Sequence, residues 1–590
     1  MLLSHEDLND KQIEAIESPH DILLLACPGS GKTRTLTYKI AVELSKLKSP
    51  RKRVIAITYT NNAASEIVER IELLGVNTKQ LWIGTIHAFC LEWILKPYWI
   101  YHNRLPNGFQ VVSGFGSEKL IEELCATQQG IRIFDCGYYF ESKGRVLQCS
   151  LAKETRVHRI LDEYDNRLEQ AGLIDFEQML LFAFQIIDTQ PKVSKLLSNI
   201  FSCILVDEYQ DTKEIQYQII CRVLRAGNGS VGAFFVGDPN QSIFTTLGGF
   251  AMDIHALNQL SNLSFDERKL TKNYRNSDRI ISFFDNFKVT QSEIISAAEN
   301  KHYPSLVTFD RSTPKEHLVD EIVRLIRLNC EQCGIPQNEI CIVGPWWIHL
   351  ASLTRSLVSK LPDYDFDGPG LTPFQRDIEN FWYKVARLIL TKPAPNTYIR
   401  RLRWASDVLA DLEGVGAGVQ VDSRGFLRLV NGLGNAVEQD GLKYLNRCFD
   451  DLLEELAINC SLHESLLEHR ISFFESAKVR ITRMLNDGIE FAGDRDTFFR
   501  AFAHKNGVFV SSIHGVKGLE FDTVIAFAML EGAVPNFNDT DNLASANKLL
   551  YVISSRARKN LHLVSESGRR NQPHPTSRLL DIDFSYTSKI

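Results

Sequence analysis

Lys32 and Thr33 end the segment Ala26–Thr33, which reads Ala-Cys-Pro-Gly-Ser-Gly-Lys-Thr. The apolar run Ile22–Leu25 precedes it and predicts a buried parallel strand, and a helical pattern follows it. A strand, a glycine-bearing loop and a helix start together form the context in which backbone N–H groups bind phosphate. In that context the lysine reaches the β- and γ-phosphates and the threonine hydroxyl binds Mg²⁺. The alternative is a glycine-rich turn in another α/β protein.

Two adjacent carboxylates, Asp207 and Glu208, follow the apolar segment Ser202–Val206. Beside a phosphate loop, Asp207 would hold Mg²⁺, and Glu208 would orient and deprotonate an attacking water. A strand that ends in Asp-Glu is common, so the pair takes its meaning from the phosphate loop. Gln241 follows a further strand-like segment, Ala233–Gly237, and would reach a γ-phosphate in the same arrangement.

Other side chains suit the base and phosphates of a nucleotide. Gln12 stands shortly before the phosphate loop, and its amide both donates and accepts, as the edge of adenine requires. Tyr274 offers a ring that stacks on a base, and the adjacent Arg275 offers a guanidinium that bridges phosphate oxygens.

The elements that position these groups are spread over 590 residues, more than one hydrophobic core normally serves, so we expect roughly two to four domains. No apolar run is long enough to cross a membrane, and the start of the chain is too short and acidic for a signal peptide. We therefore expect a cytoplasmic protein without membrane contact. The net charge of -6 does not exclude nucleic acid, because a local basic channel is enough for phosphate contacts. The 12 scattered cysteines favour free thiols over a disulfide framework or a metal site.

Short apolar strands alternate with helical segments over most of the chain, which predicts an α/β fold with parallel sheets. Residues 92–173 and 393–499 break this pattern and are predicted to be mainly helical insertions. The predicted domains are a first α/β domain of residues 1–91 and 174–280 with the insertion 92–173, and a second of residues 281–392 and 500–590 with the reduced insertion 393–499.

In this order and spacing, the motifs resemble those of superfamily 1A DNA helicases of the UvrD/Rep/PcrA type over nearly the whole chain. The segments that carry the resemblance are Leu8–Ile16, Ala26–Thr33, Ile57–Ile67, Gly84–Phe89, Val206–Thr212, Gly237–Phe244, Leu270–Ser277, Ile513–Phe521 and Leu549–Arg558. The resemblance implies two RecA-like P-loop domains with an ATP site between them. It also implies ATP and Mg²⁺ as cofactors, single-stranded or tailed DNA as partner, and translocation from 3′ to 5′.

Roles carry over from the family by position. The catalytic residues would be Lys32, Glu208, Gln241, Arg275 and Arg556. Nucleotide would be bound by Gln12, Ala26, Cys27, Pro28, Gly29, Ser30, Gly31, Lys32, Thr33, Arg34, Tyr274 and Glu520, and the metal ion by Thr33 and Asp207. The DNA strand would lie over Tyr59, Asn61, His87, Ser512 and His514. Arg275 and Arg556 would act as arginine fingers, which contribute ~10³–10⁵ in rate.

The chain departs from the family at Thr245–Leu247, where a tryptophan and an arginine are usual. That tryptophan would stack on a base, worth ~1–3 kcal/mol, and that arginine helps to link DNA to ATP. Asn547, Lys548 and Ser555 replace the usual Arg, Arg and Thr of the last motif. The second insertion is shorter than usual, as in compact relatives such as the Gabija B protein of bacterial antiviral systems.

The sequence therefore predicts an ATP-dependent 3′–5′ DNA translocase and helicase. The main alternative is a DNA-sensing ATPase subunit that regulates a partner nuclease, or another protein subunit, and unwinds little. A third possibility is an adaptor that only binds DNA, and the intact Lys32, Asp207, Glu208 and Arg556 argue against it. No nuclease-like cluster of carboxylates and lysine follows the last motif, so we expect no intrinsic nuclease.

Overall fold

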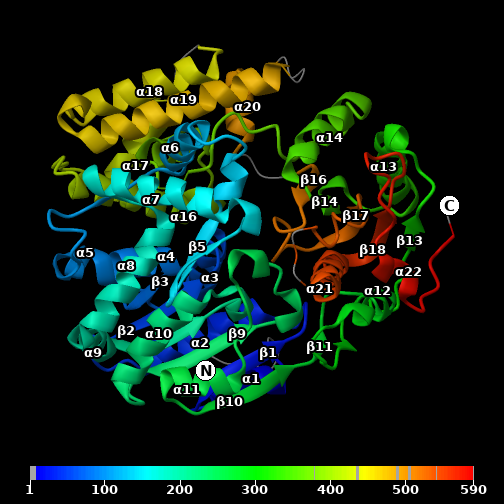
Figure 1. The fold of residues 1–590 in the computed structure, drawn as a ribbon, viewed down its shortest axis with the longest axis horizontal. Coiled ribbons are helices and arrows are strands. Elements are labelled where there is room, and N and C mark those ends of the chain that lie inside the picture. The colour runs from blue at the N-terminus through cyan, green and yellow to red at the C-terminus, as the bar shows by residue number, and fades with distance from the viewer. Residues whose placement is uncertain are drawn as a thin grey trace. The chain divides into compact units, whose positions relative to one another are not determined.

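The computed structural model describes residues 8–377, 379–433, 438–486, 491–502, 506–537, 539 and 541–588 (Figure 1). The chain divides into two compact units. Unit 1 consists of Met1–Val111, Ile121–Lys315 and Ile513–Ile590, and unit 2 of Val112–Leu120 and Glu316–Ser512. No helix in the described ranges is both long and apolar enough to cross a membrane.

The main sheet of unit 1 has six parallel strands in the order β10-β1-β9-β8-β2-β3. Its strands, in that order, are Phe265–Leu270, Asp21–Ala26, Gly232–Gly237, Phe201–Val206, Arg53–Thr58 and Leu81–Thr85. The four inner strands are buried along nearly their whole length, as expected for parallel strands covered on both faces. Because all strands run the same way, their carboxyl ends share one edge, where ligands bind in such sheets.

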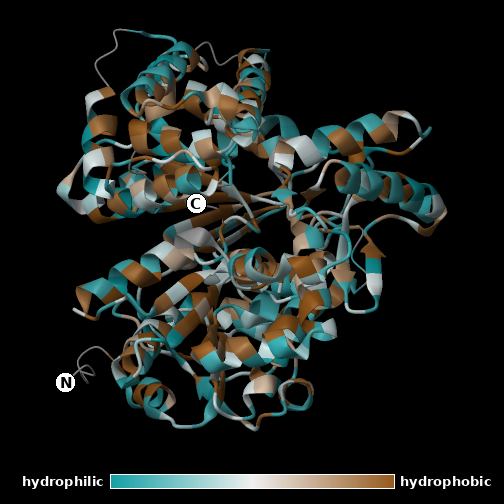
Figure 2. Ribbon diagram, turned by 90° about the vertical axis from the view of Figure 1, so that its left-hand side faces the viewer, coloured by the Kyte–Doolittle hydropathy of each residue, from teal (hydrophilic) through white to brown (hydrophobic). Residues whose placement is uncertain are grey.

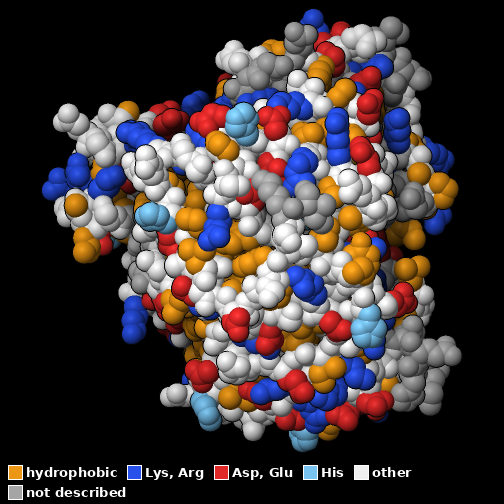
Figure 3. Space-filling view, turned by 90° about the vertical axis from the view of Figure 1, so that its right-hand side faces the viewer, with side chains coloured by type: hydrophobic (Ala, Val, Ile, Leu, Met, Phe, Trp, Pro, Cys, Tyr) orange, Lys and Arg blue, Asp and Glu red, His pale blue; other side chains and the backbone are white. Residues whose placement is uncertain are grey.

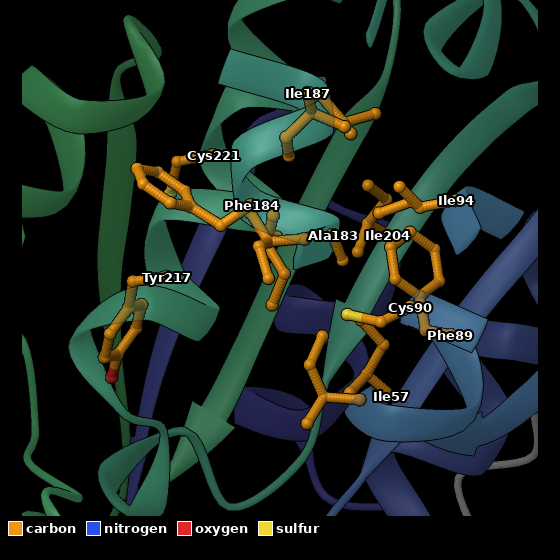
Figure 4. Packing of buried hydrophobic residues seen from close by; sticks show 14 of the residues in the cluster. Ile57, Phe89, Cys90, Ile94, Ala183, Phe184, Ile187, Ile204, Tyr217 and Cys221 are labelled. Atoms are coloured by element: carbon orange, nitrogen blue, oxygen red, sulfur yellow. The ribbon is translucent and has the colours of Figure 1, made fainter. Parts of the chain in front are cut away.

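Helices cover both faces of this sheet. On one face, Leu36 and Ile40 of α2 pack on Ile22 and Leu24 of β1. On the other face, side chains of α8 and α10 meet those of β2, β8 and the segment Phe89–Ile94 (Figure 4). The helices around the sheet are α1 (Asp10–Glu17), α2 (Lys32–Lys46), α3 (Asn61–Leu73), α4 (Ile86–Phe89), α8 (Phe176–Thr189), α9 (Pro191–Ile200), α10 (Glu214–Gly227) and α11 (Ile254–Ser261).

The stretch predicted as the first insertion is mainly helical but includes an antiparallel hairpin, β5–β6. Its elements are α5 (Lys96–Tyr98), β4 (Gln110–Val111), α6 (Gly114–Ala126), β5 (Tyr138–Glu141), β6 (Gly144–Leu147), α7 (Glu154–Gln170) and β7 (Leu173–Ile174). The hairpin is fixed to the main sheet's helices, because the backbone and hydroxyl of Ser142 both donate to the carboxylate of Glu214 in α10.

Unit 1 also contains three parallel strands in the order β13-β18-β17. These strands and their neighbours are β11 (Lys272–Asn273), α12 (Asp278–Phe284), β12 (Ile295–Ser296), β13 (Val307–Asp310), β17 (Phe521–Ala526), α21 (Asn542–Ser555), β18 (Ala557–Val564) and α22 (Ser577–Asp581). The turn from α21 into β18 carries Arg556, which is thereby fixed between a buried helix and a buried strand.

Unit 2 combines parallel strands with a helical bundle. Its elements are α13 (Leu318–Arg327), β14 (Ile340–Gly344), α14 (Trp347–Lys360), β15 (Phe366–Asp367), α15 (Phe381–Leu390), α16 (Tyr398–Gly414), α17 (Ser423–Gly432), α18 (Gly441–Glu455), α19 (Glu464–Asn486), α20 (Arg495–Arg500) and β16 (Val508–Ser512). The strands β14, β16 and β15 pair in parallel, and α15–α20 share one apolar core.

Most helices are apolar along one side and polar along the other, as a helix covering a core must be (Figure 2). The predicted α/β class with parallel sheets is confirmed. The boundaries of the four predicted domains stay a prediction.

Candidate nucleotide site and strand-binding edge

The phosphate loop connects β1 to α2, as its sequence predicts. Gly29 and Gly31 have φ angles of 64° and 80°, in the left-handed region that favours glycine. A Cβ atom on Gly29 would lie 2.5 Å from Cβ of Arg275, and one on Gly31 would lie 2.6 Å from Nε2 of Gln12. At both positions the backbone angle and the close neighbouring atoms therefore favour glycine over any other residue. Ala26, which replaces the usual first glycine, is the last residue of β1 and needs no unusual backbone angle.

Lys32 lies opposite the carboxylate pair at the end of β8. Its Nζ is 3.2 Å from Oε1 of Glu208, although 176 residues separate the two in the chain. Burial raises the pKa of Glu208, but Lys32 and Lys517 outweigh it, so the pKa falls below the ordinary value. Glu208 is thus an anion at neutral pH. Its φ of 49° is rare for a side-chain-bearing residue and marks a strained position.

Asp207 and Thr33 offer oxygen atoms that fit a magnesium ion. Asp207 is 8% exposed, and burial and the adjacent Glu208 raise its pKa. A cation bound there would offset that effect. Thr33 stands in the first turn of α2, directly after Lys32. A hydroxyl and a carboxylate are hard oxygen ligands of the kind that Mg²⁺ prefers, so these residues fit the metal ion.

Gln241 joins a carboxylate to an arginine. Its Nε2 donates to Oδ2 of Asp238 at 2.7 Å, and its Oε1 accepts from Nη2 of Arg556 at 2.6 Å. Arg556 is 2% exposed and also donates to the carbonyl oxygens of Val552 and Leu519. Burial and then Arg275 lower the pKa of Arg556 to about 9, which leaves the guanidinium charged at neutral pH.

Arg275 lies beside the phosphate loop, next to Gly29. Its Nε donates to Oε2 of Glu520 at 2.5 Å, and its Nη1 lies 3.5 Å from the carbonyl oxygen of Ser555. Glu520, predicted to bind nucleotide, also accepts from Arg558. The two predicted arginine fingers thus lie next to the same stretch of backbone.

Gln12 and Tyr274, predicted to contact adenine, are linked by Asn9, for which no role in nucleotide binding is predicted. Asn9 caps α1 with its Oδ1 and donates from Nδ2 to Oη of Tyr274 at 2.8 Å. Gln12 is 3% exposed, accepts from the backbone N–H of Asn9 and donates to the carbonyl oxygen of Ser30. The ring of Tyr274 is 44% exposed and presents a face for a base. Arg34, at the start of α2, is exposed.

Two of the predicted DNA-binding residues lie together on the strand-end edge. The ring of Phe244 has its centroid 4.8 Å from that of Tyr59 and 5.2 Å from that of His514. Tyr59 is 43% exposed, so the column of three rings has an open end. His87 packs edge-on against Phe176 instead, and burial lowers its pKa to about 4.

The other two predicted DNA-binding residues are Ser512 and Asn61. Ser512 ends β16 in unit 2. Asn61 begins α3, but its side chain lies outside the described residues. On the face drawn in Figure 3, basic and acidic side chains are interspersed. The candidate strand-binding groups that the structure brings together at this edge are the rings of Tyr59, Phe244 and His514.

Lys517 and Asp211 form a buried ion pair that the sequence reasoning missed. Lys517 also donates to the carbonyl oxygen of Gln241 at 2.7 Å, and its Nζ lies 5.4 Å from the centroid of the Phe244 ring. Burial raises the pKa of Asp211 to about 6. Both residues lie inside recognised motifs, so the available signal was a charged residue without an assigned partner.

The loop Thr245–Leu247, where the family's tryptophan and arginine are absent, is an exposed single turn. Nε2 of Gln148 donates to the carbonyl oxygen of Thr246 at 2.5 Å. A Cβ atom on Gly248 would lie 2.6 Å from the ring of Tyr139. The hairpin β5–β6 and the residue that follows it therefore hold this loop in place.

Comparisons with known proteins agree with these geometric features. The UvrD/REP helicase N-terminal domain matches residues 8–262, and the UvrD-like helicase C-terminal domain matches residues 474–568. These ranges include the phosphate loop, the carboxylate pair and the segment with Arg556.

Several relatives are DNA helicases. DNA helicase II of Salmonella typhimurium is 31% identical over 301 residues, which are 47% of this chain and 39% of that protein. DNA helicase II of Haemophilus influenzae is 25% identical over 640 residues, 96% of this chain and 85% of that protein. ATP-dependent DNA helicase PcrA of Staphylococcus epidermidis is 22% identical over 651 residues, 98% of this chain and 86% of that protein. The 31% identical match thus spans less than half of that relative, whereas the two longer matches span most of theirs.

Proposed function

The chain belongs to the UvrD/Rep helicase family, and on that premise we propose that it hydrolyses ATP to move along single-stranded DNA from 3′ to 5′ and to separate tailed duplexes. The observation that carries the proposal is Gln241, bonded on one side to Asp238 and on the other to Arg556. This contact joins the end of the main sheet to the turn before β18, and γ-phosphate would bind beside it.

In the proposed reaction, Lys32 leaves Glu208 and binds the β- and γ-phosphate oxygens. The freed carboxylate of Glu208 then takes the proton of the attacking water. Burial raises the pKa of Glu208 and Lys32 is the largest cause that lowers it, so the departure of Lys32 makes Glu208 a stronger base. Gln241 orients the γ-phosphate, while Arg275 and Arg556 stabilise the charge that develops on it. Bound Mg²⁺, held by Thr33 and Asp207, would neutralise charge on the phosphate oxygens.

Coupling to DNA would pass through the motif that contains Gln241. Phe244 stands three residues after Gln241 and packs between Tyr59 and His514. A base stacked on Tyr59 would therefore be linked, through the rings of Tyr59 and Phe244, to the backbone of the motif that contains Gln241. Lys517 reaches both Phe244 and the carbonyl oxygen of Gln241, so it connects the same two sites.

A second function, a DNA-sensing ATPase that unwinds little, is favoured by the loop Thr245–Leu247. The loop contains no aromatic residue, and its backbone is held by Gln148. A base would still stack on Tyr59, backed by Phe244, which is enough to signal that a strand is bound but gives one stacking platform fewer to hold it. Under this proposal the protein works in the cytoplasm with a nuclease or other subunit as partner.

The deciding experiment compares DNA-stimulated ATP hydrolysis with strand displacement on duplexes carrying a 3′ or a 5′ tail. The translocase proposal expects stimulation by single strands and displacement only from the 3′ tail, both lost in Lys32→Ala. Stimulation without displacement would favour the sensor. Hydrolysis that DNA does not stimulate would contradict both.

A further inference from the structure

Asn273 and Asn276 form a buried amide pair that none of the proposed roles uses. Both side chains are 0% exposed. They flank Tyr274, which is exposed, and Arg275, which is half-buried, so the segment buries its first and fourth residues fully. A buried amide is costly unless it is hydrogen-bonded, which makes its partners informative.

The bonds of Asn273 fix its orientation. Its Oδ1 accepts from the backbone N–H groups of Arg275 and Asn276, each at 2.8 Å. Its Nδ2 must therefore point the other way, where it donates to the carbonyl oxygen of Pro28 at 2.9 Å and to Oδ1 of Asn276 at 2.8 Å. All four hydrogen-bonding positions of this amide are used. Asn273 is thus locked between the phosphate loop and Asn276.

Asn276 continues the connection to the turn that carries Arg556. Its Nδ2 donates to the carbonyl oxygens of Ser555, at 3.1 Å, and Ala557, at 2.5 Å. These two carbonyl groups stand immediately before and after Arg556. A continuous line of hydrogen bonds therefore runs from Pro28 through the two amides to both sides of Arg556; we call this line the asparagine relay.

Tyr274 and Arg275, beside the relay, also contact the phosphate loop. The backbone N–H of Tyr274 donates to the carbonyl oxygen of Gly29 at 2.9 Å, and Arg275 packs against Gly29. A displacement of the phosphate loop would therefore shift the middle of the relay, next to Arg275, and the far end of the relay, next to Arg556.

We infer that Asn273 and Asn276 are positioning residues, which set Arg275 and Arg556 relative to the phosphate loop and pass changes in that loop to Arg556. The inference rests on the proposed hydrolysis of ATP, because it assigns the two residues to that site. Neither amide touches substrate in this proposal. Their effect is exerted through the two guanidinium groups.

The main test removes the far end of the relay with Asn276→Ser. The expected result is a fall in kcat of about 10-fold or more, while the affinity for a fluorescent ADP analogue changes less than about 3-fold, because Lys32 and Thr33 are untouched. In an Arg556→Ala background, Asn276→Ser should lower kcat little further, since a residue that acts through Arg556 is non-additive with it. Equal multiplicative losses in both backgrounds would overturn the inference.

The matched control is Ser277→Ala. Ser277 is also 0% exposed and bonds to Oγ of Ser305 at 2.6 Å, but its side chain is outside the relay. It should lower the melting temperature as much as Asn276→Ser and leave kcat unchanged. A similar fall in kcat in both variants would show that the amide is merely structural. If Asn276→Ser does not fold, Asn273→Asp, which keeps both accepting bonds and loses both donors, must show the same pattern.

Hydrogen exchange separates the relay from the hydrolysis proposal. On binding a non-hydrolysable ATP analogue, Leu549–Arg558 should gain protection in the wild type and in Ser277→Ala, but not in Asn276→Ser, while the phosphate loop gains protection in all three. This result is expected even if the wild type proves a poor ATPase, which would overturn the function and not the relay. Unchanged protection of Leu549–Arg558 in Asn276→Ser would overturn the relay alone.

Discussion

Arg556 donates a 2.6 Å hydrogen bond to Gln241, across 315 residues of chain, from a position in which it is 2% exposed. A charge so deeply buried is costly to hold without partners, and its partners here are Gln241, the hydroxyl of Ser555 and backbone carbonyl groups. The guanidinium is therefore pre-set in its orientation before any phosphate binds. Catalysis benefits from donors that need no reorganisation in the transition state.

Arg556→Ala should accordingly lower kcat by about 10³-fold, with a much smaller effect on the KM for ATP, because the group acts on charge that develops during transfer. Steady-state hydrolysis in the presence of single-stranded DNA measures both constants. Arg70→Ala, which removes an exposed arginine paired with Glu66 on α3, is the control for loss of a guanidinium. A rise in KM with unchanged kcat would mean that Arg556 only binds nucleotide.

Glu208→Gln should abolish hydrolysis and keep nucleotide binding. The amide cannot take a proton from water, so kcat should fall by about 10²–10⁴-fold. Lys32 then loses the carboxylate 3.2 Å away and is free for phosphate, so the affinity for ATP should hold or rise. Equilibrium binding of a fluorescent ATP analogue together with phosphate release tests this pair of outcomes. Weakened binding with residual turnover would assign Glu208 to structure rather than to the chemical step.

His87 should make the stability of the protein fall in acid. Burial lowers its pKa to about 4 in the folded chain, against about 6.5 unfolded. Between those values the unfolded chain binds more protons, so stability is full above pH 6.5 and falls as the pH drops towards 4, by at most about 3 kcal/mol. Urea unfolding of wild type and His87→Gln at pH 4.5 and 7 measures it, and the variant should show a smaller difference. An equal difference in both proteins would exclude His87 as the source.

Tyr59 should bind DNA by stacking, with its ring backed by Phe244. Tyr59→Ala should weaken single-strand affinity by about 5- to 150-fold, equal to ~1–3 kcal/mol, and leave the KM for ATP unchanged. Fluorescence anisotropy with a labelled oligonucleotide gives the affinity. Phe134→Ala is the matched control, because that ring is 89% exposed and lies in a different part of unit 1. Equal losses in the two variants would point to a general effect of exposed rings.

The sequence predicts contacts between residues that follow neighbouring parallel strands, but not contacts that depend on how distant segments pack together. Lys32 and Glu208 follow parallel strands, and because parallel strands end at one edge, their meeting follows from local patterns alone. Asn9 and Tyr274 are different, since their hydrogen bond depends on how α1 packs against a segment 265 residues away. No local pattern marks an asparagine that caps a helix with one end and holds a tyrosine with the other.

The hairpin β5–β6 was missed for a different reason. Its strands have four residues each, too few for a clear alternation in a stretch that otherwise has a helical pattern. The turn Ser142–Gly144 between aromatic and branched residues was a usable signal. The hairpin places Gln148 where it supports Thr246, a contact that no pattern in either segment predicts.

The side chains of the loop Thr245–Leu247 are exposed and leave room for the tryptophan and arginine that are usual in the family. Thr246→Trp with Leu247→Arg should tighten single-strand affinity by about 5- to 150-fold through one added stacking surface. If the loop limits coupling, strand displacement should rise more than DNA-stimulated hydrolysis, since the ATP site is unchanged. Thr246→Arg with Leu247→Trp, the same two residues in exchanged order, controls for added charge and ring area. Displacement that rises equally with both orders, or with neither, would place the limit on unwinding outside this loop.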